Sequence, residues 1–122
     1  RSTLFPYTTL FRSPAGGVSR NVTKSHLSQT DDHVTEREDL LDEKGESENL
    51  QPLLIINRFL NLPPSERPEV DKTTIKKAEE KYEILIITTE ELLKLYEYYK
   101  NGNITSEKII ERFKNEIGLF KL

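Results

Sequence analysis

Two short apolar runs constrain the fold of this chain more than any other feature. The first is PLLIINRF, from Pro52 to Phe59, and the second is EILIITT, from Glu83 to Thr89. Neither run alternates polar with apolar residues, and an unbroken apolar run of this kind is typical of a parallel strand buried on both faces. We therefore predict two buried strands in an α/β fold.

The residues between the two runs predict a loop followed by a helix. The stretch NLPPSERPE, residues 61–69, carries Pro63, Pro64 and Pro68, which exclude both a helix and a central strand. A helix is expected from Asp71 or Thr73, either of which would cap it, to about residue 82. Strand, helix and strand in this order connect through a right-handed crossover, so the two strands are expected to be parallel.

Two further helices are expected after the second strand, which gives the order βαβα. Thr88 and Glu91 have the spacing of a capping box, so a helix begins where the strand ends. Asn101 and Gly102 end this helix, because both residue types tolerate positive φ. The last helix is expected to begin near Thr105 or Ser106. The residues expected on the buried faces of these helices are Leu92, Leu95, Tyr96, Tyr99, Ile109, Ile110 and Phe113.

Residues 14–50 are interpreted as a polar lead-in and a helix. Apolar residues keep a sparse helical spacing between about residues 21 and 43, and these are Val22, Leu27, Val34 and Leu41. The segment is expected either to lie on the sheet through one narrow face or to be frayed. His26 and His33 are seven positions apart, and we interpret them as two solvated histidines rather than metal ligands.

The first thirteen residues, RSTLFPYTTLFRS, fit no targeting signal. Pro6, Thr8 and Thr9 interrupt the continuous apolar stretch of a secretory signal, and Pro6 also interrupts the amphipathic helix of a mitochondrial presequence. Over its whole length, the segment resembles the in-frame translation of a common sequencing adapter. We interpret residues 1–13 as an artefactual adapter translation, and expect them to stay out of the core and the authentic N-terminal part to be missing.

The composition of the chain excludes several functions. Its 122 residues include no cysteine, which excludes disulfides, thiolate nucleophiles and cysteine-based zinc sites. The net charge of −3 provides no broad attraction to nucleic acid. No apolar run approaches the roughly 20 residues that a membrane span needs. We expect a cytoplasmic protein without a membrane partner.

A longer pattern combines both apolar runs with the residues around them. It consists of LLIINRFLNLPPSERP, a helix that ends in AEEKY, and ILIITTEELLKLYE, and it covers residues 52–100. The pattern resembles the carboxyl-terminal half of a restriction-endonuclease-like domain of the PD-(D/E)XK nuclease superfamily. The positions that match are Asn57, Arg58, Pro63, Pro64, Glu66, Arg67, Ala78, Thr88 and Thr89. The resemblance implies that residues 51–122 are a truncated βαβα unit with a parallel strand pair, the remnant of a restriction-endonuclease-like fold.

The resemblance also implies a chemistry for the parent protein. Such nucleases hydrolyse phosphodiesters with Mg²⁺ held by at least two carboxylates, and a lysine supports the attacking water. The family places Glu-x-Lys and then Gly before its flanking helix, whereas this chain has PAGGVSR from Pro14 to Arg20. Asp31 and Asp32 diverge by about 100° on a helix and do not share a metal. We therefore assign no catalytic residue, metal ligand or cofactor to this chain, and expect Mg²⁺ only in an intact parent.

Five residues are predicted to contact nucleic acid. Asn57 and Arg58 lie at the end of a strand, where open α/β sheets place groups that face a ligand. Gln29 matches the Gln that the family often carries on the helix after its catalytic strand. Arg20 and Lys24 lie beside Gln29 in the sequence, and the alternative for both is a solvated surface position.

Other interpretations remain open for the arginines and threonines at the strand ends. An ion pair with Glu66 or Glu69 is the alternative for Arg58. Arg67 is expected to hold the proline-rich loop rather than to touch DNA, and Thr88 is expected to act as a helix cap.

Two functions of different classes follow from these interpretations. The first is a fragment of a metal-dependent DNA endonuclease of defence or repair type, which meets DNA through the missing N-terminal part. The second is a non-catalytic α/β interaction module of a signalling or defence protein, whose helices bind a partner.

Overall fold

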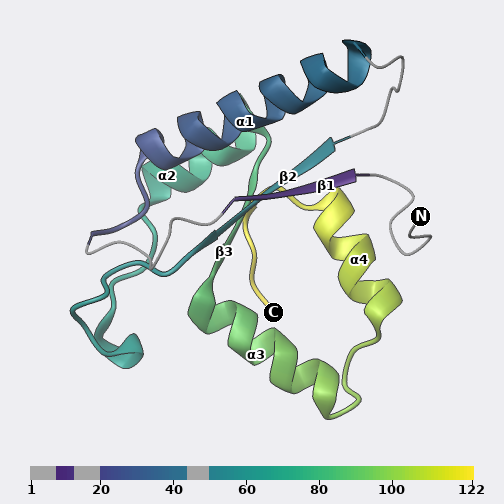
Figure 1. Ribbon diagram of the computed structural model, residues 1–122. Coiled ribbons are helices and arrows are strands. Elements are labelled where there is room, and N and C mark those ends of the chain that lie inside the picture. Colours follow the sequence, from purple (N-terminus) through teal and green to yellow (C-terminus); the bar gives the residue numbers. More distant parts are fainter. Residues whose placement is uncertain (1–7, 13–19, 44–49) are drawn as a thin grey trace.

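The protein contains one parallel β-sheet with helices on both of its faces (Figure 1). The computed structural model describes residues 8–12, 20–43 and 50–122. The sheet has four strands in the order β1-β2-β3-β4, and every neighbouring pair is parallel. The strands are β1 (Thr8–Arg12), β2 (Leu50–Ile56), β3 (Leu85–Thr88) and β4 (Gly118–Leu119). The predicted α/β class is confirmed.

The central pair of strands agrees with the sequence prediction. β2 and β3 are parallel neighbours, with Leu54 opposite Ile86 and Ile56 opposite Thr88. Their side chains enter two separate core clusters. The first contains Val22, Leu27, Leu54, Ile56, Val70, Ala78, Ile84 and Ile86, and the second contains Leu53, Leu85, Ile87, Leu95 and Phe120. Both faces of these strands are therefore buried, which explains why their sequences are apolar without alternation.

Two of the four strands, β1 and β4, were not predicted from the sequence. β1 pairs with β2 over residues 50–54, a strand pairing that the interpretation of residues 1–13 did not predict, while the expectation that these residues stay out of the core concerns side chains that lie outside the described part of the chain. The rest of that segment, like residues 14–19 and 44–49, lies outside the described residues. β4 follows the last helix, where Gly118 N and Phe120 N donate to Ile84 O and Ile86 O, both at 2.8 Å. A two-residue strand is too short to produce a hydrophobic period.

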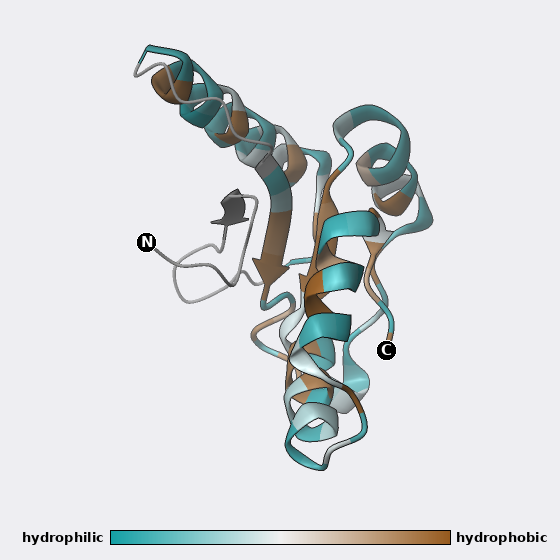
Figure 2. Ribbon diagram, turned by 90° about the vertical axis from the view of Figure 1, so that its right-hand side faces the viewer, coloured by the Kyte–Doolittle hydropathy of each residue, from teal (hydrophilic) through white to brown (hydrophobic). Residues whose placement is uncertain are grey.

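The helices are distributed over the two faces of the sheet. α1 and α2 lie on one face and α3 and α4 on the other (Figure 1). Their bounds, with two short helical turns, are α1 (Lys24–Glu43), η1 (Pro64–Glu66), α2 (Lys72–Lys77), η2 (Ala78–Tyr82), α3 (Thr89–Lys100) and α4 (Ser106–Asn115). In Figure 2, apolar β2 and β3 lie between helices with hydrophilic outer surfaces. No helix in the described parts of the chain is both long and apolar enough to cross a bilayer.

Helix α1 lies on the sheet through the narrow apolar face that its sequence predicted. The four predicted apolar positions are buried, and Thr30 is buried among them. The Thr30 hydroxyl is satisfied, because Oγ1 donates to His26 O at 2.9 Å. His33 is exposed as predicted, but the prediction of a solvated His26 was wrong. His26 is buried, and its Nδ1 accepts a hydrogen bond from Thr23 N at 2.9 Å in the first turn of the helix.

Helices α3 and α4 begin at the predicted caps. Thr88 Oγ1 accepts from Glu91 N at 3.3 Å, and Thr105 Oγ1 accepts from Lys108 N at 3.2 Å. Both hydroxyls satisfy amide groups that the first helical turn leaves without a partner. The sequence had therefore predicted the start of each helix correctly.

The predicted buried face of α3 was only partly correct. Leu95 is buried, but Tyr96 and Tyr99 are 57% and 48% exposed. The end of α3 lies beyond the sheet in both ribbon views (Figures 1 and 2), so its last turns have no apolar surface to cover. In α4, Ile109, Ile110 and Phe113 are half-buried.

Candidate functional site

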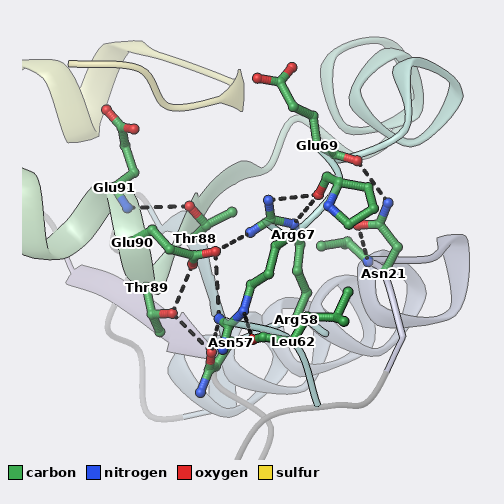
Figure 3. Close-up of polar contacts among 12 residues, drawn as sticks. Asn21, Asn57, Arg58, Leu62, Arg67, Glu69, Thr88, Thr89, Glu90 and Glu91 are labelled. Atoms are coloured by element: carbon green, nitrogen blue, oxygen red, sulfur yellow. Dashed lines mark hydrogen bonds and ion pairs between the residues drawn. The ribbon is translucent and has the colours of Figure 1, made fainter. Parts of the chain in front are cut away.

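Polar side chains gather where β2 and β3 end. Asn57 and Arg58 follow β2 directly, and Thr89 and Glu90 begin α3 directly after β3. Because β2 and β3 are parallel and end side by side, these four residues meet at one edge of the sheet (Figure 3). Arg67 reaches the same place from the proline-rich loop. We call this group, namely Asn57, Arg58, Arg67, Thr88, Thr89 and Glu90, the carboxyl edge.

Arg58 is the most deeply enclosed charge of the carboxyl edge, with 7% of its surface exposed. Its Nη1 donates to Glu90 Oε1 at 2.7 Å, and its Nε and Nη2 donate to Pro68 O at 3.1 and 2.8 Å. The predicted alternative of an ion pair was correct in kind but named the wrong partners, Glu66 or Glu69. Arg58 thus links the strand end, the proline-rich loop and the first turn of α3.

Arg67 holds the loop, as its sequence context predicted. Its Nε donates to Leu62 O at 3.0 Å, within the loop, and its Nη1 donates to Asn57 Oδ1 at 2.6 Å. The same Nη1 lies 3.5 Å from Glu90 Oε1. The Asn57 side chain therefore has a structural role at the end of β2, while the residue keeps partial exposure.

Glu90 joins both arginines and was not identified from the sequence. Partial burial acts to raise the pKa of Glu90, but hydrogen bonds from its own backbone amide and from Thr89, with the charge and hydrogen bond of Arg58, outweigh burial and lower it. Glu90 is therefore held as a carboxylate. An acidic residue in the first turn of a helix that directly follows a strand was the available signal, since helix N-termini favour negative charge.

The two threonines at the start of α3 are also engaged. Thr88 is buried and caps the helix. Thr89 Oγ1 lies 3.1 Å from Asn57 Oδ1 and 3.0 Å from Glu90 Oε2. Both are acceptors, so the single hydroxyl proton serves one of them at a time. The two threonines therefore stabilise the carboxyl edge through hydrogen bonds to residues of the chain itself.

A cleft of about 180 Å³ opens beside the carboxyl edge. Its charged lining residues are Arg58, Arg67, Lys94, Lys121, Glu69, Glu90 and Glu91. Four cations against three carboxylates give this lining a net charge of +1, in a chain whose net charge is −3. The lining of the cleft is therefore positively charged, whereas the chain as a whole is negatively charged.

The remaining predicted contact residues lie on the segment that leads into α1. Arg20, Lys24 and Gln29 are exposed. The carbonyl of Arg20 accepts from Phe59 N at 3.2 Å, three residues after the end of β2. The structure therefore brings Arg20 next to Asn57 and Arg58. Gln29 lies further along α1, which leads away from this edge (Figure 1).

The described residues do not fit the Mg²⁺ site that the family resemblance implies. Within residues 8–12, 20–43 and 50–122, no group of three or more histidine, aspartate and glutamate side chains is arranged to hold a metal ion. Glu90 is bound by two arginines rather than facing a second carboxylate. We therefore derive no metal-dependent step from these residues.

Comparisons with known protein families, curated proteins and solved structures give no match to this chain. The carboxyl edge and the exposed residues around it are therefore the features of this chain that indicate a function. The geometry of this edge separates two kinds of cation. Arg58 and Arg67 are bound by the protein itself, whereas Arg20 and Lys24 are directed to solvent.

Proposed function

We propose that this chain is a fragment of a DNA endonuclease-like protein, and that it contacts DNA without cleaving it. The observation that carries the proposal is the position of Arg20. Its carbonyl accepts a hydrogen bond from Phe59 N, three residues after the end of β2, while its side chain and that of Lys24 are exposed. Arg20 therefore lies beside the carboxyl edge, and Lys24 follows it at the start of α1; open parallel sheets bind their ligands at the carboxyl ends of their strands.

In this proposal the five predicted contact residues have different roles. Arg20 and Lys24 attract phosphates, because exposed lysine and arginine release counterions when they bind DNA. Gln29 is exposed on α1 and offers an amide to a sugar or phosphate oxygen. Asn57 and Arg58 keep the strand end and the loop in place, since their side chains are bonded to Arg67, Glu90 and Pro68.

The parallel β2–β3 pair supports the proposed nuclease-like origin. The crossover passes through α2 on one face, and α3 follows β3 on the other, in the order that the resemblance implied. The described residues lack a metal-binding group. We therefore expect the parent's carboxylates, lysine and Mg²⁺ to belong to another segment.

Binding and cleavage are tested on the purified chain. A fluorescent duplex of roughly 20 base pairs should bind weakly at low salt and dissociate at moderate salt, because few phosphates are contacted. Arg20→Ala/Lys24→Ala should lower this affinity roughly tenfold. The matched control is Lys100→Ala/Lys108→Ala, which removes two exposed lysines from the far end of α3 and from α4 and should leave binding unchanged. Equal affinity for all three proteins, or no binding at low salt, would refute the proposed function.

Supercoiled plasmid provides the test of cleavage. The chain with Mg²⁺ or Mn²⁺ should leave the plasmid intact, because the described carboxylates do not form a metal site. Metal-dependent nicking by the chain, lost in Asp31→Asn/Asp32→Asn/Asp39→Asn, would show that α1 carries catalytic carboxylates. That result would contradict the proposal that the catalytic carboxylates belong to another segment of the parent protein.

The second candidate is a non-catalytic interaction module, and the exposed side of α3 favours it. Leu93 and Tyr96 are more than half exposed, and Tyr98 and Tyr99 are also exposed. Tyrosines with a free apolar surface are common in protein interfaces. This candidate replaces the first if the chain has no measurable affinity for DNA at low salt.

A further inference from the structure

We infer that Lys94 and Lys121 form a second phosphate contact for the DNA that Arg20 and Lys24 bind. This inference rests on the proposed function and extends it across the carboxyl edge. Lys94 belongs to α3, and Lys121 follows β4. Both line the cleft of about 180 Å³ beside Arg58 and Arg67.

The two lysines are cations whose present partners are easily replaced. Their side chains are 68% and 59% exposed. Lys94 Nζ lies 3.8 Å from Glu91 Oε1, and Lys121 Nζ lies 3.6 Å from Glu69 Oε1. Lys121 and Glu69 form an exposed pair, which contributes little to stability, whereas Lys94 is exposed beside the buried carboxylate of Glu91. A phosphate group offers each lysine a stronger partner, because it forms charge-assisted hydrogen bonds.

The other charges of the cleft are committed to the protein. Arg58 and Arg67 share Glu90. Glu91 Oε2 accepts a hydrogen bond from Leu122 N at 2.8 Å, so this buried carboxylate holds the last residues of the chain. Lys94 and Lys121 are therefore the cations of this cleft that are available to a ligand.

Glu69 connects this pair of lysines with the first DNA contact. Its carbonyl accepts from Asn21 Nδ2 at 2.9 Å, next to Arg20, while its carboxylate faces Lys121 (Figure 3 shows Glu69 beside Asn21). Glu69 thus lies between Lys121 and Asn21, the residue that follows Arg20. Glu69 is also the competitor of a bound phosphate, since its side chain is 81% exposed and can turn away from Lys121.

The inference is tested by measuring duplex affinity against salt for four proteins. These are the unchanged chain, Lys94→Ala/Lys121→Ala, Glu69→Gln, and the control Lys100→Ala/Lys108→Ala. Loss of two phosphate contacts should lower affinity roughly tenfold and make the slope of log K against log salt shallower by about 1.8. Glu69→Gln removes the competing carboxylate and keeps the carbonyl that Asn21 uses, so it should raise affinity. Thermal unfolding of each variant verifies that these surface changes leave the fold intact, and Lys94→Gln/Lys121→Gln repeats the test with longer side chains.

The outcomes separate this inference from the proposed function. If Arg20→Ala/Lys24→Ala weakens binding while Lys94→Ala/Lys121→Ala and its Gln counterpart bind like the unchanged chain, the second contact is refuted and the proposed function stands. If neither pair affects binding, or the chain does not bind the duplex, both are refuted. If both double variants bind the duplex more weakly and Glu69→Gln binds it more tightly, the proposed function and the second contact are both supported.

Discussion

Two sets of cations at the same edge of the sheet differ in what surrounds them. Arg58 and Arg67 have side chains that are 8% exposed, and their guanidinium groups are bonded to Glu90, Asn57 and loop carbonyls. Arg20, Lys24, Lys94 and Lys121 are exposed. The first set therefore holds the loop and helix against the strand end, and the second set faces solvent, where we propose that it contacts phosphate. A cation at a strand end is thus not sufficient evidence of a ligand contact; its burial and partners decide its role.

The largest effect that would test this comparison is the loss of Arg58. Arg58→Ala leaves Glu90 without its closest cation and Pro68 O without its donors, so unfolding should become easier by about 3 kcal/mol. Urea unfolding followed by circular dichroism measures this change. Arg20→Ala, the matched exposed arginine, should keep the urea midpoint of the unchanged chain. Equal midpoints for the two variants would remove the distinction between structural and solvent-facing cations.

A smaller effect is expected at the helix caps. Two helices are capped by a threonine, and one of these threonines is buried while the other is exposed. Thr88→Ala removes the acceptor for Glu91 N and should cost about 1–2 kcal/mol, since the amide stays buried. Thr105→Ala removes the acceptor for Lys108 N at an exposed site, where water replaces it, and should cost about 0.5 kcal/mol. Urea midpoints rank the two variants. A larger loss in Thr105→Ala would contradict the role given to burial.

The smallest effect concerns the pH dependence that Glu90 contributes. Its pKa in the folded chain lies below its ordinary value of 4.5, so the folded state favours the carboxylate. The stabilisation is present above pH 4.5 and is lost as the pH falls below 4.5 through the lowered pKa. The stability of the unchanged chain should therefore fall more steeply in this acid range than that of Glu90→Gln. Parallel curves from urea unfolding at several pH values would show that Glu90 is not held as a carboxylate.

The sequence predicted the parts of this fold that depend on local pattern. The apolar runs predicted β2 and β3 and their parallel order, and Thr88 and Thr105 predicted two helix starts. These features could be predicted because strand burial and helix capping depend on residues that are close together in the sequence. β4 was missed because Gly118 and Leu119 alone carry no period. Gly118 is needed there for a three-dimensional reason, since it has φ +91° and an added Cβ would lie 2.7 Å from Glu79 Cγ.

The candidate site was predictable only in outline. Asn57 and Arg58 were identified because they follow a strand, but the partner of Arg58 depends on the register of β2 against β3, which brings Glu90 beside it from 32 residues away. Lys94 and Lys121 belong to distant parts of the sequence and share one cleft only in the folded chain. The burial of Tyr96 and Tyr99 was wrongly predicted, because periodicity does not reveal where a helix passes the end of the sheet.

The most direct test of the proposed DNA contact is an NMR titration of the isotope-labelled chain with a short duplex. Backbone amides of residues 20–29, together with those of Lys94 and Lys121, should shift as duplex is added, and the shifts should reverse when salt is raised. Amides around Lys100 and Lys108 should stay in place. Shifts confined to the Tyr96–Tyr99 end of α3, or no shifts at low salt, would contradict the account.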